Sequence, residues 1–234
     1  MRAIAKRELK AYFSSPIGYV CIGVLSALFG YYFYQVLLSG STYYLSSVYN
    51  MMFMWGMMVI PLITMKSMSE DRKNRTDQML LTSQVGLYSL VAGKFLAALT
   101  VYAIGLALSL FPCLVISFYA DLSWGIVCGN VLGSLLYAGA MISIGIFLSS
   151  LTESQIIAAV STFGVSIVLM VIDQMAFMLQ NDVLETIVGW TSFSSRFVPF
   201  AKGILDVSSI VFFLSVAVGF LFLTARKLES RRWN

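Results

Sequence analysis

Residues that usually carry out catalysis or bind metals are scarce in this sequence. Its 234 residues include no histidine, which is the most common general base and a common metal ligand in proteins. The three cysteines, Cys21, Cys113 and Cys128, lie within or at the edge of apolar segments and form no Cys-x-x-Cys pair. We therefore expect no catalytic residue, no metal site and no disulfide framework in this chain.

One Gly-Lys pair, Gly93-Lys94, resembles the end of a phosphate-binding loop. That loop has a glycine five residues before its second glycine and a Ser or Thr after its lysine. This chain has Tyr88 and Phe95 at those two places. We therefore expect the chain to bind no ATP by this route and to hold no cofactor of its own.

The densest group of mixed charge runs from Ser69 to Asp77. Glu70 suits a helix N-terminus, and Ser67 with Glu70 could form a capping box. The Met79-Leu80-Leu81 stretch that follows is apolar enough to dock onto another surface. Two interpretations remain open: a solvated loop that fixes membrane topology, or a docking helix that receives mechanical input from a partner.

The composition around this charged block is that of an integral membrane protein. Hydrophobic residues make up 59% of the chain and charged residues 11%, and the mean hydropathy is +0.86, whereas soluble domains carry roughly 25% charged residues. Apolar runs long enough to cross a bilayer predict an all-α fold with six transmembrane helices, and Pro112 predicts a kink in the third. The predicted segments are an amphipathic interfacial helix (1–15), six spans (17–38, 44–65, 90–119, 124–148, 156–179 and 207–224), a cytoplasmic loop (66–89) and an outer segment (180–206).

The positions of the basic residues predict the orientation of these spans. Lys and Arg gather on the cytoplasmic side of membrane proteins. With a cytoplasmic N-terminus, all of the 15 Lys and Arg except Arg196 and Lys202 fall on that side. We expect both termini and the 66–89 loop to be cytoplasmic in a multi-pass protein of the inner (plasma) membrane. The net charge of +4 then reflects topology and contact with lipid headgroups, and no nucleic-acid partner is expected.

Three features inside the spans are candidates for further roles. Met51, Met54 and Met58 share one helical face, and their thioethers could line a pathway for an apolar substrate, pack adaptably, or bind Cu(I). Asp173 is the acid that lies well inside an apolar span, so it is a pathway candidate, with interface snorkelling or a hydrogen bond to a neighbouring helix as alternatives. A small-residue face, Gly125, Gly129 and Gly133, predicts close helix contact, within the same subunit or across a dimer.

Five stretches of the chain occur together in a specific order and spacing. They are Arg7–Pro16, Glu70 with Arg75–Ser83, Gly93–Phe95, Ser149–Gln155 and Leu228–Trp233. On these stretches the chain resembles, over its full length, the membrane subunit of ABC type-2 permeases, nearest to the gliding-motility and nitrous-oxide-accessory branch. It departs from that family at Gln84, where Pro is frequent, and at Arg75, where Gly is frequent.

The resemblance implies a function for the charged block. In that family the loop after the second span holds a coupling helix that sits on a separate cytoplasmic ATPase subunit, and ATP and Mg bind in that partner. It also implies an exporter, a pairing with a second copy or a different membrane subunit, and short re-entrant helices in 180–206. The coupling residues that it indicates are Glu70, Asp71, Arg72, Arg75, Thr76, Asp77, Leu80 and Leu81.

Two other functions remain open at this point. A membrane scaffold or assembly subunit without transport would use the same loop to bind a partner that is not an ATPase. An ion-driven secondary transporter would need buried ionisable relays, for which Asp173 alone offers little support.

Overall fold

The computed structural model describes residues 2–39, 45–74, 76, 86–118, 123–179 and 192–232, and every regular element among them is a helix. This confirms the predicted all-α class. The helices are α1 (Arg2–Ser14), α2 (Pro16–Ser39), α3 (Leu45–Thr64), α4 (Ser69–Lys73), α6 (Leu87–Leu108), α7 (Leu110–Ser117), α8 (Trp124–Leu151), α9 (Gln155–Leu179), α11 (Phe193–Ala201) and α12 (Val207–Arg232).

Six stretches of the described chain are long and apolar enough to cross a membrane, as the sequence predicts. They correspond to α2, α3 with its extension to α4, α6 with α7, α8, α9 and α12. The third of them is broken at Ser109, three residues before Pro112. Proline has no N–H to donate to the carbonyl four residues earlier, here that of Leu108, so the break lies where the predicted kink requires it.

Helix α8 forms the centre of the bundle, and α3, α6, α9, α11 and α12 all pack against it. In the apolar stretch of α8, 67% of the residues are buried, whereas the share is 22% in α12 and 17% in α9. Small residues make this central position possible because they let neighbouring helices approach closely. A Cβ placed on Gly145 would lie 2.7 Å from the Cβ of Thr64 on α3, so the α3–α8 crossing has no room for a side chain there.

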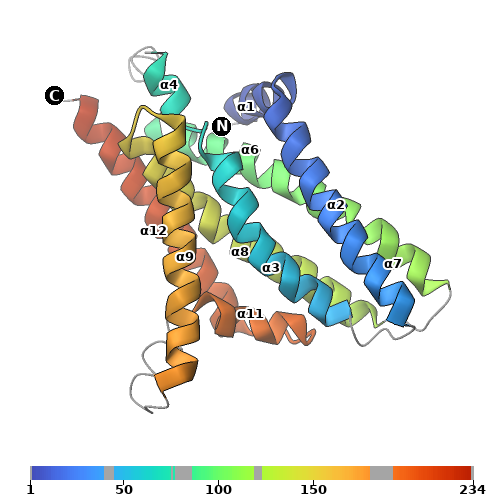
Figure 1. Ribbon diagram of the computed structural model, residues 1–234. Helices are drawn as coiled ribbons and strands as arrows, with labels where there is room; N and C mark the ends of the chain where they lie inside the picture. The colour runs from blue at the N-terminus through green and yellow to red at the C-terminus, as the bar shows by residue number, and fades with distance from the viewer. Residues whose placement is uncertain are drawn as a thin grey trace.

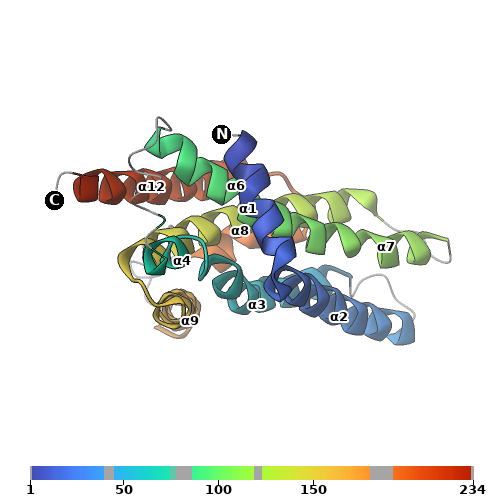
Figure 2. The ribbon, with the colours of Figure 1, turned by 90° about the horizontal axis from the view of Figure 1, so that it is seen from above.

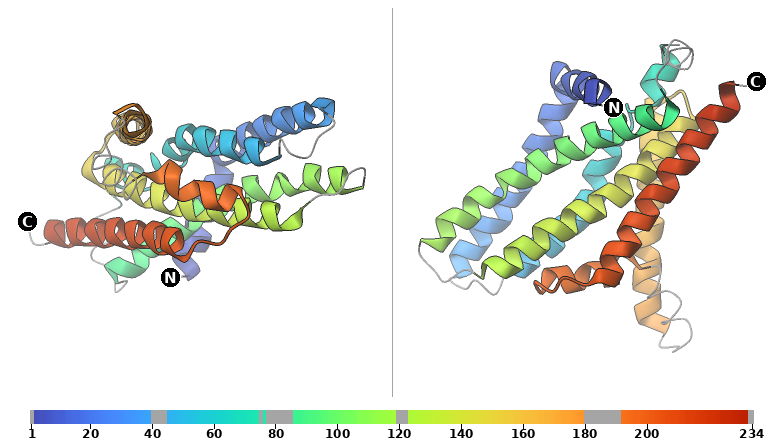
Figure 3. Two further views of the ribbon diagram at one scale, coloured as in Figure 1. Left: turned by 90° about the horizontal axis from the view of Figure 1, so that it is seen from below. Right: turned by 180° about the vertical axis from the view of Figure 1, so that it is seen from behind.

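The two ends of the molecule carry different elements. Both chain termini, α1 and α4 lie at one end, and α11 lies at the other (Figures 1 and 3). Helix α1 runs across this end of the bundle, over α6 and beside α2 (Figure 2), as expected for a helix on a membrane surface. We call this the α1–α4 end.

The outer segment predicted at 180–206 is described from residue 192 onward, and there it forms α11 and a turn into α12. Gly203 in that turn has a φ of 76°, a conformation that favours glycine. The glycine face of α8 packs on this segment: a Cβ on Gly129 would lie 2.9 Å from the carbonyl oxygen of Phe200, and one on Gly133 would lie 2.6 Å from the Cβ of Phe200. Gly129 and Gly133 of the small-residue face therefore make close contacts within one subunit, whereas a Cβ on Gly125 would meet nothing within 4 Å.

Candidate functional site

The start of α4 is held by a side chain of α8. The Ser149 hydroxyl accepts hydrogen bonds from the backbone N–H groups of Met68 and Ser69, each at 3.1 Å, and donates to the carbonyl of Met65 at 3.2 Å. Ser149 is fully buried. The first N–H groups of a helix have no partner within it, so an external acceptor at this place fixes where α4 begins and how it meets α8.

The capping box predicted for Ser67 and Glu70 is therefore wrong. The residue that caps α4 is Met68, which supplies no side-chain hydrogen bond, and the Ser67 hydroxyl has no hydrogen-bond partner. Glu70 pairs instead with Lys66, at 3.9 Å. The physical reason is tertiary: Ser149 already occupies the position that a local cap would take.

Arg72 joins α4 to the connection between α8 and α9. Its guanidinium donates to the carbonyl of Leu151 at 2.9 Å and pairs with Glu153 at 3.2 Å. A planar guanidinium presents several N–H donors in a fixed fork, so Arg72 can hold the carbonyl and the carboxylate at once. Arg72 therefore links α4 to the connection after the fourth span.

A buried lysine lies at the junction of α1, α4 and α6. Lys94 on α6 is 2% exposed, and its ammonium contacts the Asp71 carboxylate of α4 at 2.6 Å and the Glu8 carboxylate of α1 at 3.2 Å. It also donates to the carbonyl of Ser67 at 2.5 Å. We name these four residues, Glu8, Ser67, Asp71 and Lys94, the Lys94 cluster.

The electrostatics of the Lys94 cluster favour a fixed geometry. A buried ammonium is costly to desolvate unless its donors and its charge are matched, and here two carboxylates and one carbonyl surround it. Arg7 pairs with the outer side of Glu8 at 2.7 Å, and this hydrogen bond raises the pKa of the Arg7 guanidinium. Thr76 donates to the second oxygen of the Asp71 carboxylate at 3.0 Å, which leaves the first one for Lys94.

Further contacts press α1 onto the same junction. The Tyr12 hydroxyl donates to the carbonyl of Ile63 near the end of α3 at 2.8 Å, and burial raises the pKa of this phenol. Ile4 lies so close to Gly93 that a Cβ there would come within 2.8 Å of its side chain. Through these contacts and the Lys94 cluster, α1 is joined to α3, α4 and α6.

Four of the predicted coupling residues are described, and they divide between two sides of α4. Asp71, Arg72 and Thr76 face the bundle through the contacts above, whereas Glu70 has a side chain that is 43% exposed and lies beside the exposed Lys73 and Asn74. The other predicted members, Arg75, Asp77, Leu80 and Leu81, lie outside the described residues.

The sequence reasoning missed the residues that anchor α4. Lys94, Glu8, Ser149 and Glu153 lie in stretches that resemble the family, but the sequence alone assigns none of them a role in holding α4. Lys94 gave one signal that could have identified it, since a lone lysine in an otherwise apolar span requires a buried partner. Its partners are 86 and 23 positions away in the chain, so spacing alone does not reveal them.

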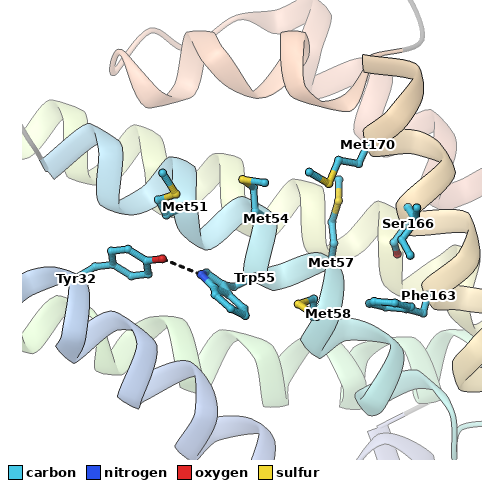
Figure 4. A pocket seen from close by; sticks show the side chains of 10 residues that line it. Tyr32, Met51, Met54, Trp55, Met57, Met58, Phe163, Ser166 and Met170 are labelled. Atoms are coloured by element: carbon cyan, nitrogen blue, oxygen red, sulfur yellow. Dashed lines mark hydrogen bonds between the residues drawn. The ribbon is translucent and has the colours of Figure 1, made fainter. Parts of the chain in front are cut away.

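The predicted pathway residues Met54 and Met58 line a pocket of about 350 Å³ between α2, α3 and α9 (Figure 4). Met51, the third methionine of that face, lines it as well.

Asp173 falls within α9, and its side chain lies outside the described part of the structure. Within the described ranges no three His, Cys, Asp or Glu side chains gather in a way that could hold a metal ion.

These observations define a class of protein: a polytopic helical membrane protein with a rigidly anchored polar helix at one end. A comparison with protein-family models makes the assignment specific, because the model described as ABC-2 family transporter protein matches residues 29–225. The chain therefore belongs to the ABC-2 transporter family, whose members are membrane components of ABC transporters. A comparison with curated proteins finds no match.

Proposed function

We propose that this chain is the permease subunit of an ATP-driven exporter and that the exposed side of α4 binds a separate cytoplasmic ATPase. ATP and Mg bind in that partner, and this chain does no covalent chemistry. Two copies of the chain, or one copy with a different membrane subunit, pair with two ATPases. The resemblance to the gliding-motility and nitrous-oxide-accessory branch supports export, and the excess of Lys and Arg at the α1–α4 end supports a cytoplasmic location for both termini in the inner membrane.

The observation that carries this proposal is the way α4 is attached. Ser149 joins it to α8, Arg72 joins it to the α8–α9 connection, and Lys94 joins it to α6 and α1. A loop that only fixed topology would need neither the buried contacts of Ser149 and Lys94 nor the link through Arg72. A force applied to α4 would instead be distributed over three spans, α6, α8 and α9, which is what a coupling helix requires.

The two sides of α4 then have separate tasks. Glu70, Lys73 and Asn74 form the exposed side that contacts a partner, whereas Asp71 and Arg72 transmit its movement to the spans. The pathway itself passes Met54 and Met58, with Asp173 as a further candidate. ATP-driven closure of the ATPases tilts the spans and changes the side to which the pathway opens.

Co-purification tests this proposal. The full chain, extracted from its native membrane, is expected to bring down an ATPase with Walker motifs, which mass spectrometry identifies. The double charge reversal Glu70→Lys with Lys73→Glu is expected to abolish the ATPase signal, and Lys227→Glu on the exposed side of α12 serves as the control. Capture of a stoichiometric partner without Walker motifs would support the scaffold alternative and contradict the proposal. Substrate movement that persists when ATP is depleted would favour an ion-driven transporter.

A further inference from the structure

The pocket between α2, α3 and α9 is lined almost wholly by thioethers and aromatic rings. Five methionines, three rings, one isoleucine and one serine surround its volume of about 350 Å³: Met51, Met54, Met57, Met58, Met170, Tyr32, Trp55, Phe163, Ile167 and Ser166. Figure 4 shows Tyr32 and Trp55 at one side and Phe163 and Met170 of α9 at the other. The volume falls within the range of roughly 300–1,000 Å³ that small-molecule sites occupy.

The polar groups of this pocket are used within the protein. The Trp55 indole N–H donates to the Tyr32 hydroxyl at 3.0 Å, and the Ser166 hydroxyl donates to the carbonyl of Thr162 at 3.0 Å. Among the described residues that line the pocket, none is Asp, Glu, Lys or Arg. A charged ligand would meet no counter-charge from these described side chains, so they favour an uncharged ligand.

The entrance of the pocket faces the bilayer core. Met51, Met54 and Met58 are between 42% and 46% exposed, and Ile167 is 45% exposed, whereas Met57 at the base is 5% exposed. These positions lie within membrane-spanning helices, where the surroundings of exposed side chains are hydrocarbon. A ligand would therefore enter sideways from the membrane, in which it is already dissolved.

The dimensions and the lining favour a compact ring over a lipid chain. Seven helical steps separate Met51 from Met58, which corresponds to roughly 10 Å along α3. One leaflet of the hydrocarbon core is roughly 15 Å deep, so an extended acyl chain is longer than the pocket. Thioethers make favourable contacts with ring edges and adapt to irregular shapes, and aromatic side chains favour offset or edge-on ring contacts.

We propose that this pocket binds a compact, uncharged, aromatic molecule that enters from the bilayer. The inference rests on the proposed permease function, in which Met54 and Met58 line the pathway, and it names the class of substrate for that pathway. The adaptable methionines accommodate different ring shapes, so recognition depends on size and lack of charge more than on directional hydrogen bonds.

Trp55 provides an internal probe for this proposal. The full chain in detergent micelles keeps Trp55 as its only tryptophan after Trp124→Phe, Trp190→Phe and Trp233→Phe, and pyrene is titrated as an uncharged aromatic acceptor of Trp55 emission. Saturable quenching with one pyrene for each chain is expected. Ile167→Phe should weaken the apparent affinity roughly tenfold by filling the pocket, and Leu214→Phe, on an exposed face of α12 outside the pocket, should leave it unchanged.

A second variant keeps the pocket testable if Ile167→Phe fails to fold. Replacing Met51, Met54 and Met58 by Leu preserves size and apolarity but removes three thioethers, and it is expected to weaken pyrene binding severalfold. Quenching that is not saturable and is indifferent to these variants would mean partition into the micelle and would overturn the proposal. Equal saturable quenching by a dibrominated stearoyl phospholipid would make this a lipid-chain site instead.

Two further outcomes distinguish an aromatic-ligand site from a soft-metal site and from a failure of the proposed permease function. Displacement of pyrene by Ag(I), a stable analogue of Cu(I), would assign the methionines to a soft metal and overturn the proposal. Because the titration uses the permease chain alone, it is independent of ATPase capture. Pyrene binding without a captured ATPase contradicts only the proposed function, and a captured ATPase without pyrene binding contradicts only the substrate class.

Discussion

At the scale of single residues, Lys94 is the most consequential side chain at the α1–α4 end. It is a buried cation whose two carboxylate partners come from α1 and α4. It therefore neutralises their charge inside the protein and ties both helices to α6. Breaking a buried ion pair by removing one partner costs far more than replacing the whole pair with neutral groups. This asymmetry gives a direct test.

Lys94→Met is expected to destabilise the protein by roughly 3 kcal/mol, because it leaves Glu8 and Asp71 close together without their cation. The triple variant Lys94→Met, Glu8→Gln and Asp71→Asn should recover most of that loss. Unfolding in detergent, followed by circular dichroism, measures both. Lys73→Met, on the exposed side of α4, is the control and should change little; an equal effect at the two lysines would refute the buried role of Lys94.

Ser149 gives a second prediction at this scale. Ser149→Ala is expected to cost about 1–2 kcal/mol, because two backbone N–H groups at the start of α4 lose their acceptor. Ser143→Ala, also buried on α8, removes only a hydroxyl that donates to its own helix and should cost less. Hydrogen exchange at Met68 and Ser69 reports the change locally: faster exchange in Ser149→Ala alone is expected, and unchanged rates would exclude Ser149 as the anchor of α4.

At the scale of elements, the apolar spans and the kink at Pro112 follow from the sequence, because length, hydropathy and a missing N–H are local properties. The attachment of α4 does not. The local pattern favoured a Ser67–Glu70 cap, yet the acceptor is Ser149, about 80 positions away. Contacts across such distances depend on which helices become neighbours, and that is decided by side-chain packing throughout the bundle.

The glycine face of α8 gives a prediction for helix packing. Gly133→Ala places a Cβ against Phe200 of α11 and is expected to cost about 1–3 kcal/mol through overpacking. Gly125→Ala lies on the same face but meets nothing within 4 Å, so it should be neutral or slightly stabilising. Thermal unfolding of the two variants side by side is the measurement, and equal midpoints would contradict the α8–α11 contact.

The start of α12 gives a prediction for pH. The Asp206 carboxylate accepts hydrogen bonds from the hydroxyl and the N–H of Ser209 and from the N–H of Ser208, chiefly from that hydroxyl, and these bonds lower the pKa of Asp206. A lowered pKa in the folded protein contributes stability above the ordinary pKa of roughly 4, and this stability is lost as the pH falls through the folded value.

The thermal midpoint of the wild-type protein should therefore fall between pH 5 and pH 2 more steeply than that of Asp206→Asn. Asp206→Asn keeps an acceptor oxygen at the helix start but cannot titrate. Parallel curves for the two proteins would show that the cap does not contribute to the acid sensitivity.

At the scale of the whole molecule, the bundle connects a polar helix at one end with an apolar pocket inside the membrane. Helix α4 is fixed to α6, α8, the α8–α9 connection and α1, and α3 and α9 line the pocket. A movement of α4 cannot stay local, because packed helices shift as rigid units. Under the proposed function, ATP hydrolysis in an ATPase partner would move these spans through the Lys94 cluster.

A distance measurement in the assembled complex tests this claim most directly. Spin labels are placed at Val207→Cys at the start of α12 and at Phe118→Cys at the end of α7, both exposed, after Cys128→Ser removes the exposed native thiol. In complexes that retain the ATPase, adding ATP and Mg is expected to shift the distance distribution, and the neutral triple variant of the Lys94 cluster should lose the shift. An unchanged distribution in the wild-type complex during ATP hydrolysis, or an intact shift in the triple variant, would contradict the account.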